Sequence, residues 1–288
     1  MQALLQEGTR LLQEAGIEEA RLESRLFLEE ATGLSREALL LQEHEAVLPE
    51  AEEKFFSYIK RRVKKEPAQY IIGRCWFWGL PFWVTKEVLI PRPDTELLVE
   101  EALAIHQNEP VQEMLDLCTG SGCIPISLLT EGVAEATLTD ISPEALAVAK
   151  ENAKRLGVSQ RAICLQSDLF SACPPKRYDL ITANPPYINQ ADMAELMVDV
   201  KEYEPHLALY GGVDGLDFYR RIVPQSRDYL KMGGHLLLEI GYDQGKAVAD
   251  LMKEAGFLAV EVRQDLAGLD RVVRGCWMGQ EGKEEQHV

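Results

Sequence analysis

The sequence lacks the patterns typical of a metal site, a disulfide framework or a membrane span. Its six cysteines include no Cys-x-x-Cys pair, so we predict neither a zinc site nor a disulfide-rich fold. The first residues have no basic start or apolar run of a signal peptide, and no apolar stretch is long enough to cross a bilayer. We therefore expect a protein of the reducing cytoplasm, with no metal and no membrane partner.

Positive charge is also scarce. Lys and Arg number 30 against 47 Asp and Glu, which gives a net charge of -17. Proteins that bind duplex nucleic acid usually present a basic face. The basic run at residues 60–65 is better explained as the solvated face of a helix. The composition therefore counts against a direct nucleic-acid substrate, and the length suits a large domain plus a smaller one.

Residues 1–72 predict a small domain built of helices only. Leucines recur at helical spacing, Gly16 and Gly33 stand where helices end, and Ser35 and Pro49 stand where helices begin. No catalytic pattern occurs in this region.

Residues 73–90 predict a β-hairpin that joins this domain to the rest of the chain. Two aromatic and β-branched segments, residues 70–78 and 82–84, flank a turn at residues 79–81. Three of the four tryptophans lie here. Packing of the hairpin explains them better than a substrate-facing wall, which is the alternative.

Residues 91–288 predict an α/β catalytic domain. Strands are expected at residues 113–118, 135–140, 162–167, 178–183 and 235–240. Helices are expected between most of them, notably at residues 143–156, 216–230 and 245–255. This alternation predicts a mostly parallel sheet with helices on both faces. Two final strands, residues 258–263 and 271–278, predict an antiparallel hairpin edge, and the polar tail 281–288 is expected to be disordered.

A loop rich in glycine follows the first strand of this domain. Glycines there let a ligand approach the backbone closely, although a tight strand-to-helix turn would also use them. Pro125 stands where a dinucleotide-binding fingerprint needs its third glycine. Residues 116–122 resemble instead the acidic-x-Gly-x-Gly-x-Gly loop of S-adenosylmethionine enzymes, with Cys118 in place of the first glycine. We predict that the cofactor contacts Cys118, Thr119, Gly120, Ser121 and Gly122.

The next two strand ends fit the same nucleoside. Asp140 can accept hydrogen bonds from both ribose hydroxyls, whereas the alternative role, capping the following helix, suits Ser142 better. Asp168 and Leu169 are placed to reach the adenine amine and ring face; the alternative for Asp168 is a loop carboxylate in water. Three successive strand ends therefore predict S-adenosyl-L-methionine as cofactor and S-adenosyl-L-homocysteine as product.

The fourth strand end carries Asn184-Pro185-Pro186-Tyr187. An amide nitrogen is a poor nucleophile because its lone pair is delocalised, so a site must hold its N–H groups and aim it at the methyl donor. The Asn184 side chain can accept one N–H, the Pro185 carbonyl the other, and Tyr187 can stack on the planar group. We predict that Asn184, Pro185 and Tyr187 are catalytic, that Pro186 joins them in binding substrate, and that Asn184 also contacts the cofactor. A plain turn is the alternative.

Such a tetrapeptide serves two acceptors, the exocyclic amine of a nucleobase and the side-chain amide of a protein. A base in a duplex would have to be flipped out of the stack, and the acidic composition disfavours that partner.

Several further blocks decide between these acceptors. They are residues 67–73, 91–96, 203–209, 211–216, 239–242 and 265–268. With them, nearly the whole chain resembles the glutamine methyltransferases that modify peptide chain release factors, the protein-(glutamine-N5) methyltransferases.

That resemblance implies a class I S-adenosylmethionine-dependent methyltransferase sheet of seven strands with the last antiparallel. It implies that Arg92, Pro93 and Thr95 lie over the methionine end of the cofactor; the alternative for residues 92–95 is a capped helix start, with Asp94 or Thr95 as the cap. It also implies that the helical domain grips the substrate. The substrate would be a class 1 release factor, methylated on the glutamine of its Gly-Gly-Gln motif. Three alternatives are a glutamine methyltransferase of a large-subunit ribosomal protein, a DNA or RNA amino-methyltransferase, and an inactive adaptor.

Overall fold

The computed structural model describes residues 1–41 and 44–279. The chain forms two compact units, one of Met1–Arg74 with Met197–Tyr203 and one of Cys75–Leu196 with Glu204–Val288. The first unit thus includes a short segment from far along the chain, which the sequence did not indicate. The expected disorder of residues 281–288 lies outside the described residues.

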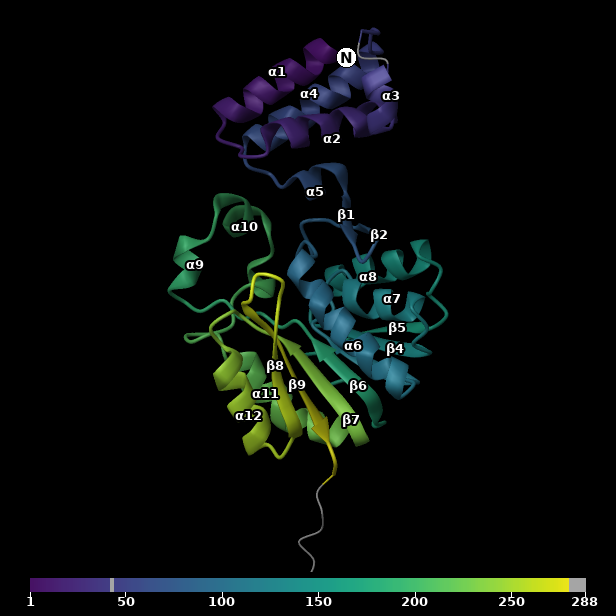
Figure 1. Ribbon diagram of the computed structural model, residues 1–288, viewed down its shortest axis with the longest axis vertical. Coiled ribbons are helices and arrows are strands. Elements are labelled where there is room, and N and C mark those ends of the chain that lie inside the picture. The colour runs from purple at the N-terminus through teal and green to yellow at the C-terminus, as the bar shows by residue number, and fades with distance from the viewer. Residues whose placement is uncertain (42–43, 280–288) are drawn as a thin grey trace, which may run out of the picture. The chain divides into compact units, whose positions relative to one another are not determined.

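The first unit is helical, as the sequence predicts (Figure 1). Its helices are α1 (Gln2–Glu14), α2 (Ala20–Thr32), α3 (Arg36–Leu41), α4 (Pro49–Val63), α5 (Ala68–Ile72) and α10 (Val198–Tyr203). Gly33 ends α2 in the left-handed conformation (φ 72°), and the Ser35 hydroxyl accepts a hydrogen bond from the Ala38 amide at 3.3 Å. Leu12, Phe27 and Phe55 are fully buried between the helices.

The predicted hairpin forms, but its first strand is shorter than expected. Strands β1 (Arg74–Phe77) and β2 (Leu80–Trp83) pair, whereas residues 70–72 belong to α5. The prediction of a strand from residue 70 was wrong because Ala68 and Ile71 pack into the helical core. That burial outweighs the β-propensity of the Tyr70–Ile72 segment.

The second unit contains a seven-stranded sheet in the order β5-β4-β3-β6-β7-β9-β8. The strands are β3 (Glu113–Leu117), β4 (Glu135–Asp140), β5 (Ala162–Gln166), β6 (Tyr178–Ala183), β7 (Leu230–Glu239), β8 (Leu258–Gln264) and β9 (Asp270–Trp277). Strands β3 to β7 pair in parallel, and β9 is antiparallel to both of its neighbours. The predicted fold class is confirmed, with β8 as the edge strand and β9 inside the sheet.

Helices cover both faces of this sheet (Figure 1). The apolar faces of α6 (Glu96–Asn108), α7 (Cys123–Thr130) and α8 (Pro143–Arg155) share one core cluster, and those of α11 (Asp217–Tyr229) and α12 (Gly245–Glu254) share the other. Met114 and Leu115 of β3 enter opposite clusters, as alternation along a strand requires.

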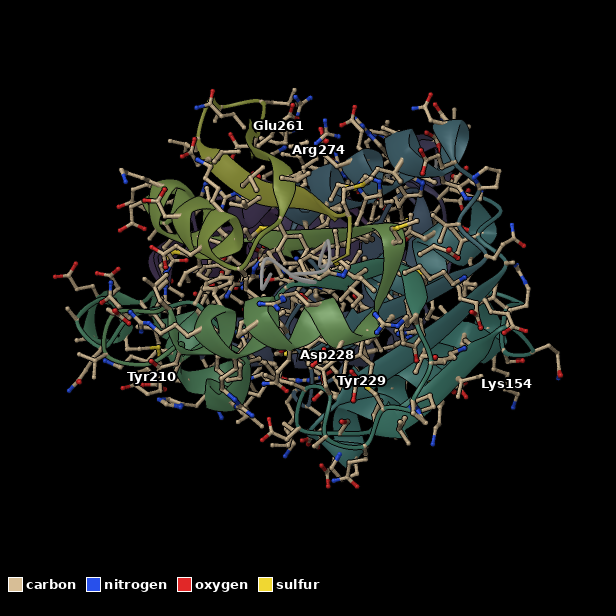
Figure 2. All side chains as sticks on the ribbon, turned by 90° about the horizontal axis from the view of Figure 1, so that it is seen from below. Lys154, Tyr210, Asp228, Tyr229, Glu261 and Arg274 are labelled. Atoms are coloured by element: carbon tan, nitrogen blue, oxygen red, sulfur yellow. The ribbon has the colours of Figure 1, made fainter. Side chains whose placement is uncertain are left out.

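The outer strands carry ion pairs. Arg274 of β9 contacts Glu261 of β8 at 2.6 Å (Figure 2). It also contacts Glu101 of α6 at 2.8 Å. Charged side chains on the edge strand β8 discourage pairing with another chain.

One buried amide fixes the hairpin to the loop after β3. The side chain of Asn152, on α8, is fully buried. Its oxygen accepts a hydrogen bond from the Trp83 amide at 2.7 Å, and its nitrogen donates to the carbonyls of Trp83 and Ser121 at 2.9 Å each. Asn152 therefore joins three segments that are distant in sequence.

Replacing Asn152 with alanine is expected to destabilise the protein by roughly 2–4 kcal/mol, because one buried and two partly buried backbone groups lose their partners. Chemical denaturation measures this free energy of unfolding. Lys154→Ala, on the exposed side of the same helix, is the control and should change it by less than about 0.5 kcal/mol. Equal effects of the two changes would contradict the assigned role.

Candidate active site

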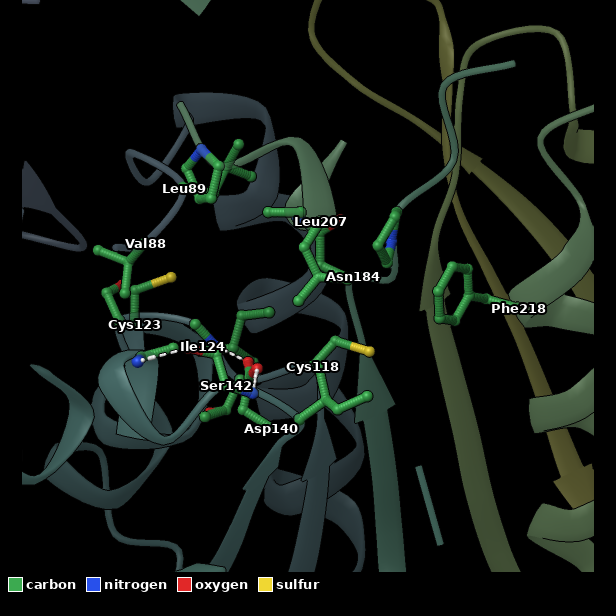
Figure 3. Close-up of a pocket in the computed structure, with 18 of the residues that line it drawn as sticks. Val88, Leu89, Cys118, Cys123, Ile124, Asp140, Ser142, Asn184, Leu207 and Phe218 are labelled. Atoms are coloured by element: carbon green, nitrogen blue, oxygen red, sulfur yellow. Dashed lines mark hydrogen bonds between the residues drawn. The ribbon is translucent and has the colours of Figure 1, made fainter. Parts of the chain in front are cut away.

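A cavity of about 370 Å³ lies where β3, β4, β5 and β6 end (Figure 3). It is lined by most of the residues that the sequence singles out: Arg92, Thr95, Cys118, Thr119, Gly120, Ser121, Asp140, Asp168, Leu169, Asn184 and Pro186. Four others, Pro93, Gly122, Pro185 and Tyr187, do not line it. The remaining lining residues are Glu87, Val88, Leu89, Pro91, Cys123, Ile124, Ile141, Ser142, Ala145, Ser167, Pro205, Leu207, Ala208, Phe218 and Arg221.

The loop after β3 has an unusual backbone. Cys118 has φ 55°, in the left-handed region that favours glycine, and it lines the cavity where a glycine is the usual residue. Such a conformation costs a non-glycine residue roughly 1–2 kcal/mol. Gly120 (φ 53°) has open space where a Cβ would stand. Gly122 instead begins α7, and a Cβ there would lie 2.8 Å from Ile126, so its role is packing.

Asp140 is held at the end of β4 by main-chain donors. Its carboxylate accepts hydrogen bonds from the amides of Gly120 at 2.9 Å and Ser142 at 3.0 Å (Figure 3). Burial raises the pKa of this carboxyl group, while those hydrogen bonds lower it. Ser142 caps α8 through the Ala145 amide at 3.0 Å, as expected. An oriented carboxylate beside the open surface of Gly120 fits the ribose of a nucleoside cofactor.

The end of β5 supplies the next part of the wall. Leu169 is 4% exposed and has φ 51°, a second non-glycine residue in the left-handed region at this cavity. Both oxygens of Asp168 accept from Arg221 of α11 at 2.8 Å. The contact of Asp168 with adenine stays a prediction, since its carboxylate already has a cationic partner. Sequence reasoning missed Arg221 and Phe218, although their spacing puts both on one side of α11.

Of the tetrapeptide after β6, some residues line the cavity and others pack in the core. Asn184 and Pro186 line the cavity, and the Asn184 amide nitrogen donates to the Thr95 hydroxyl at 3.4 Å. The half-buried ring of Tyr187 packs against the core cluster of α11 and α12. Burial raises the pKa of its phenol to about 12. Stacking of Tyr187 on a substrate therefore stays a prediction.

Residues beyond the tetrapeptide hold its backbone in place. The Gln244 side chain donates to the carbonyls of Tyr187 at 3.0 Å and Gly215 at 3.2 Å. A Cβ on Gly211 would lie 2.6 Å from the Cα of Tyr187, and one on Gly215 would lie 2.3 Å from its carbonyl oxygen. Only glycine permits this approach.

A buried ion pair joins two further walls of the cavity. The carboxylate of Glu204 accepts from the Arg92 guanidinium and, at 3.3 Å, from the Ile90 amide. The Glu204 side chain is 1% exposed. Its charge is thus balanced by Arg92, and residues 90–92 are fixed to the segment that continues through Pro205 and Leu207.

Asp116 is a second buried acid near the cavity. Thr182 donates to one of its oxygens at 2.6 Å, and the other oxygen has no hydrogen-bond partner among the described residues. Burial raises its pKa to about 7.

Neither a metal site nor a membrane-spanning helix is found among the described residues. No group of three or more His, Cys, Asp or Glu side chains is arranged to hold a metal ion within residues 1–41 and 44–279. No helix in the described part of the chain is long and apolar enough to cross a membrane.

A sheet of this order, with a nucleoside-sized cavity at the ends of its parallel strands, defines a class I S-adenosylmethionine-dependent methyltransferase. Family models match in two places: the PrmC N-terminal domain over residues 3–73 and the methyltransferase small domain over residues 93–202. This chain belongs to the release factor glutamine methyltransferases, as the following relatives show.

The release factor glutamine methyltransferase of Cereibacter sphaeroides is 47% identical over 260 residues, which cover 90% of this chain and 92% of the relative. That of Geobacter sulfurreducens is 43% identical over 265 residues, or 92% of each chain. Among solved structures, the 16S rRNA N2 G1207 methyltransferase of T. thermophilus has a TM-score of 0.51 at 18% identity and covers 71% of this chain and 49% of that one. This last likeness concerns the fold alone.

Asp140→Ala is expected to weaken binding of S-adenosylmethionine about 10- to 100-fold, because an oriented charged acceptor is lost. Isothermal titration calorimetry measures the dissociation constant. Glu135→Ala, at the exposed start of the same strand, is the control and should leave that constant unchanged. An unchanged constant for Asp140→Ala would place the ribose elsewhere.

Asp116→Asn is expected to stabilise the protein without cofactor at pH 8 by roughly 1–4 kcal/mol and to have much less effect at pH 5. The folded pKa of about 7 exceeds the ordinary 3.8. The folded state therefore holds a proton that the unfolded state has lost between these values, and stability falls as the pH rises through that window. Denaturation at both pH values measures the difference, and a gain independent of pH would contradict it.

Proposed function

We propose that this chain transfers the methyl group of S-adenosylmethionine to the side-chain amide nitrogen of the glutamine in the Gly-Gly-Gln motif of class 1 peptide chain release factors. The observation that carries the proposal is the position of Asn184. Its side chain lies in the wall of the cavity, and its amide nitrogen is engaged by Thr95. Its oxygen is therefore the atom available to a substrate N–H.

The chain's own residues do the work of positioning. The Asn184 oxygen accepts one N–H of the substrate amide, and the Pro185 carbonyl accepts the other. Each hydrogen bond contributes about 1 kcal/mol. Bound S-adenosylmethionine supplies a methyl group on a sulfonium, which is a good leaving group. Because Gln244 and the glycines at 211 and 215 fix the tetrapeptide, the nitrogen is held in line at little entropic cost.

The residues that line the cavity divide by the part of the cofactor they would hold. Asp140 holds the ribose, and Cys118 to Ser121 pass beside it. Leu169 covers the adenine. Arg92 and Thr95 lie toward the methionine end. The support for this assignment is that all of these residues line one cavity.

We further propose that the helical domain, residues 1–72, recognises the body of the release factor, with residues 73–90 as the joining hairpin and 91–288 as the catalytic domain. Exposed leucines in the first unit support an interaction role; they are Leu22, Leu26, Leu40, Leu41 and Leu48. The substrate being a translation factor, we place the reaction in the cytoplasm. The net charge of -17 disfavours direct binding of nucleic acid.

Labelled S-adenosylmethionine tests the substrate. Purified release factor, ribosomal protein and RNA are each incubated with the enzyme, and label should enter the release factor only. A factor whose Gly-Gly-Gln glutamine is changed to alanine should take up none. Label in ribosomal protein or RNA alone would overturn the proposal.

Asn184→Ala is expected to lower kcat for the release factor at least about tenfold, because one of two acceptors is lost and the nitrogen is then less well positioned. The dissociation constant of S-adenosylmethionine should change less than about threefold. Asn108→Ala, at the exposed end of α6, is the control. Loss of cofactor binding together with activity would mean that Asn184 serves the cofactor first.

A further inference from the structure

A buried carboxylate behind the cavity wall has not yet been given a role. Glu239, the last residue of β7, is 2% exposed. Its neighbour Leu238 pairs with Ala183 of β6, so Glu239 ends β7 beside Asn184. Interactions with Thr95, Arg271 and Asn184 favour the charged form of its carboxylate. One of its oxygens has no partner among the described residues. A buried ionisable group destabilises the fold unless it is paired and hydrogen-bonded.

We propose that Glu239 is a positioning residue that fixes, together with Thr95, the orientation of the Asn184 side-chain amide, so that its oxygen rather than its nitrogen faces the substrate glutamine. This inference rests on the proposed function and deepens it. It concerns how the acceptor is oriented rather than which residue the acceptor is.

The orientation matters because the two ends of an asparagine amide have nearly the same shape and opposite chemistry. With the oxygen toward the cavity, Asn184 accepts an N–H of the substrate. With the nitrogen toward the cavity, it presents donors to the two N–H donors of the substrate amide. A hydrogen-bond partner behind the amide can discriminate between the two orientations.

A carboxylate can discriminate because it only accepts hydrogen bonds. The Thr95 hydroxyl has one proton. Its interaction with Glu239 favours the charged carboxylate, and in the proposed arrangement the hydroxyl donates this proton to Glu239. The lone pairs of that hydroxyl are then left to accept from the Asn184 nitrogen, at 3.4 Å. The direction of each bond follows from the charge on Glu239. The Asn184 oxygen is thereby turned away from Glu239 and toward the cavity.

The charge on Glu239 depends on its surroundings. Arg271 favours the anion, whereas Asp94 and burial oppose it, and the pKa is raised to about 7. Arg271 is itself 3.0 Å from Asp265 and 3.4 Å from Asp94, so only part of its charge serves Glu239.

The other ionisable groups that face Glu239 are Tyr187, Tyr219 and Cys123. Burial raises the pKa of each, so they stay neutral from pH 6 to 8. When Glu239 is protonated, it can donate to Thr95, and the direction of the bonds is no longer fixed. The fraction of molecules in which the Asn184 oxygen faces the cavity therefore increases as the pH rises through about 7.

The test compares Glu239→Gln with Glu101→Gln. Both remove one charge from a buried carboxylate and keep its shape, but Glu101 pairs with Arg263 and Arg274 on the outer strands. For Glu239→Gln we expect kcat for the release factor to fall about tenfold at pH 8. The rise in kcat between pH 6 and 8 should disappear. Glu101→Gln should keep both the wild-type kcat and the rise.

Two further readouts separate positioning from damage to the fold. Calorimetry should show S-adenosylmethionine bound to Glu239→Gln within about threefold of the wild type, which also shows that the variant is folded. The side-chain amide NMR signals of Asn184 should shift with a midpoint near pH 7 in the wild type and not in Glu239→Gln. Both readouts are independent of turnover.

A wild-type kcat and pH profile for Glu239→Gln, or Asn184 signals that titrate in that variant as in the wild type, would overturn the inference. Failure of the proposed function looks different, because the wild type itself would then not label the release factor. In that case the Asn184 signals would still test the orientation.

Discussion

Parallel hydrogen bonding of β3 with β4 on one side and β6 on the other is the constraint on which the site depends. Leu117 pairs with Thr139 in β4 and with Ala183 in β6, so the three strands end level with one another. The residues that follow therefore emerge together at one edge of the sheet. The loop at residues 118–122, Asp140 and the tetrapeptide at residues 184–187 become neighbours through backbone pairing alone, before any side chain makes a specific contact.

Side-chain hydrogen bonds then fix the loops that leave this edge. Three buried polar residues do this, each for a different wall of the cavity: Asn152 holds Ser121, Gln244 holds the tetrapeptide, and Glu204 holds the segment at Arg92. Buried polar groups of this kind stabilise only when their partners are present, because an unpaired buried donor or acceptor is costly. The loops are thus well ordered although they lack regular secondary structure.

The sequence predicts what is local and periodic, and it predicts less where distant segments meet. Strand alternation and the motifs at strand ends identify the sheet and most of the cavity. The prediction of a strand from Tyr70 was wrong because it rested on β-propensity alone and did not include the helical core that buries Ile71. Arg221 and Gln244 were missed because their partners, Asp168 and Tyr187, lie far away in the chain. Nothing local indicates that residues 197–203 group with the first unit.

The tetrapeptide places one proposed acceptor on a side chain, at Asn184, and the other on the main chain, at Pro185. An amino-acid substitution replaces a side chain but leaves the main-chain carbonyl oxygen in place. Alanine scanning can therefore detect a role of the Asn184 side chain, but it does not remove the Pro185 carbonyl oxygen. A substitution can move that oxygen only by shifting the backbone, and the close contacts of Gly211 and Gly215 with residues 186 and 187 restrict such shifts. Half of the proposed recognition of the amide is in this sense less exposed to the effect of single substitutions.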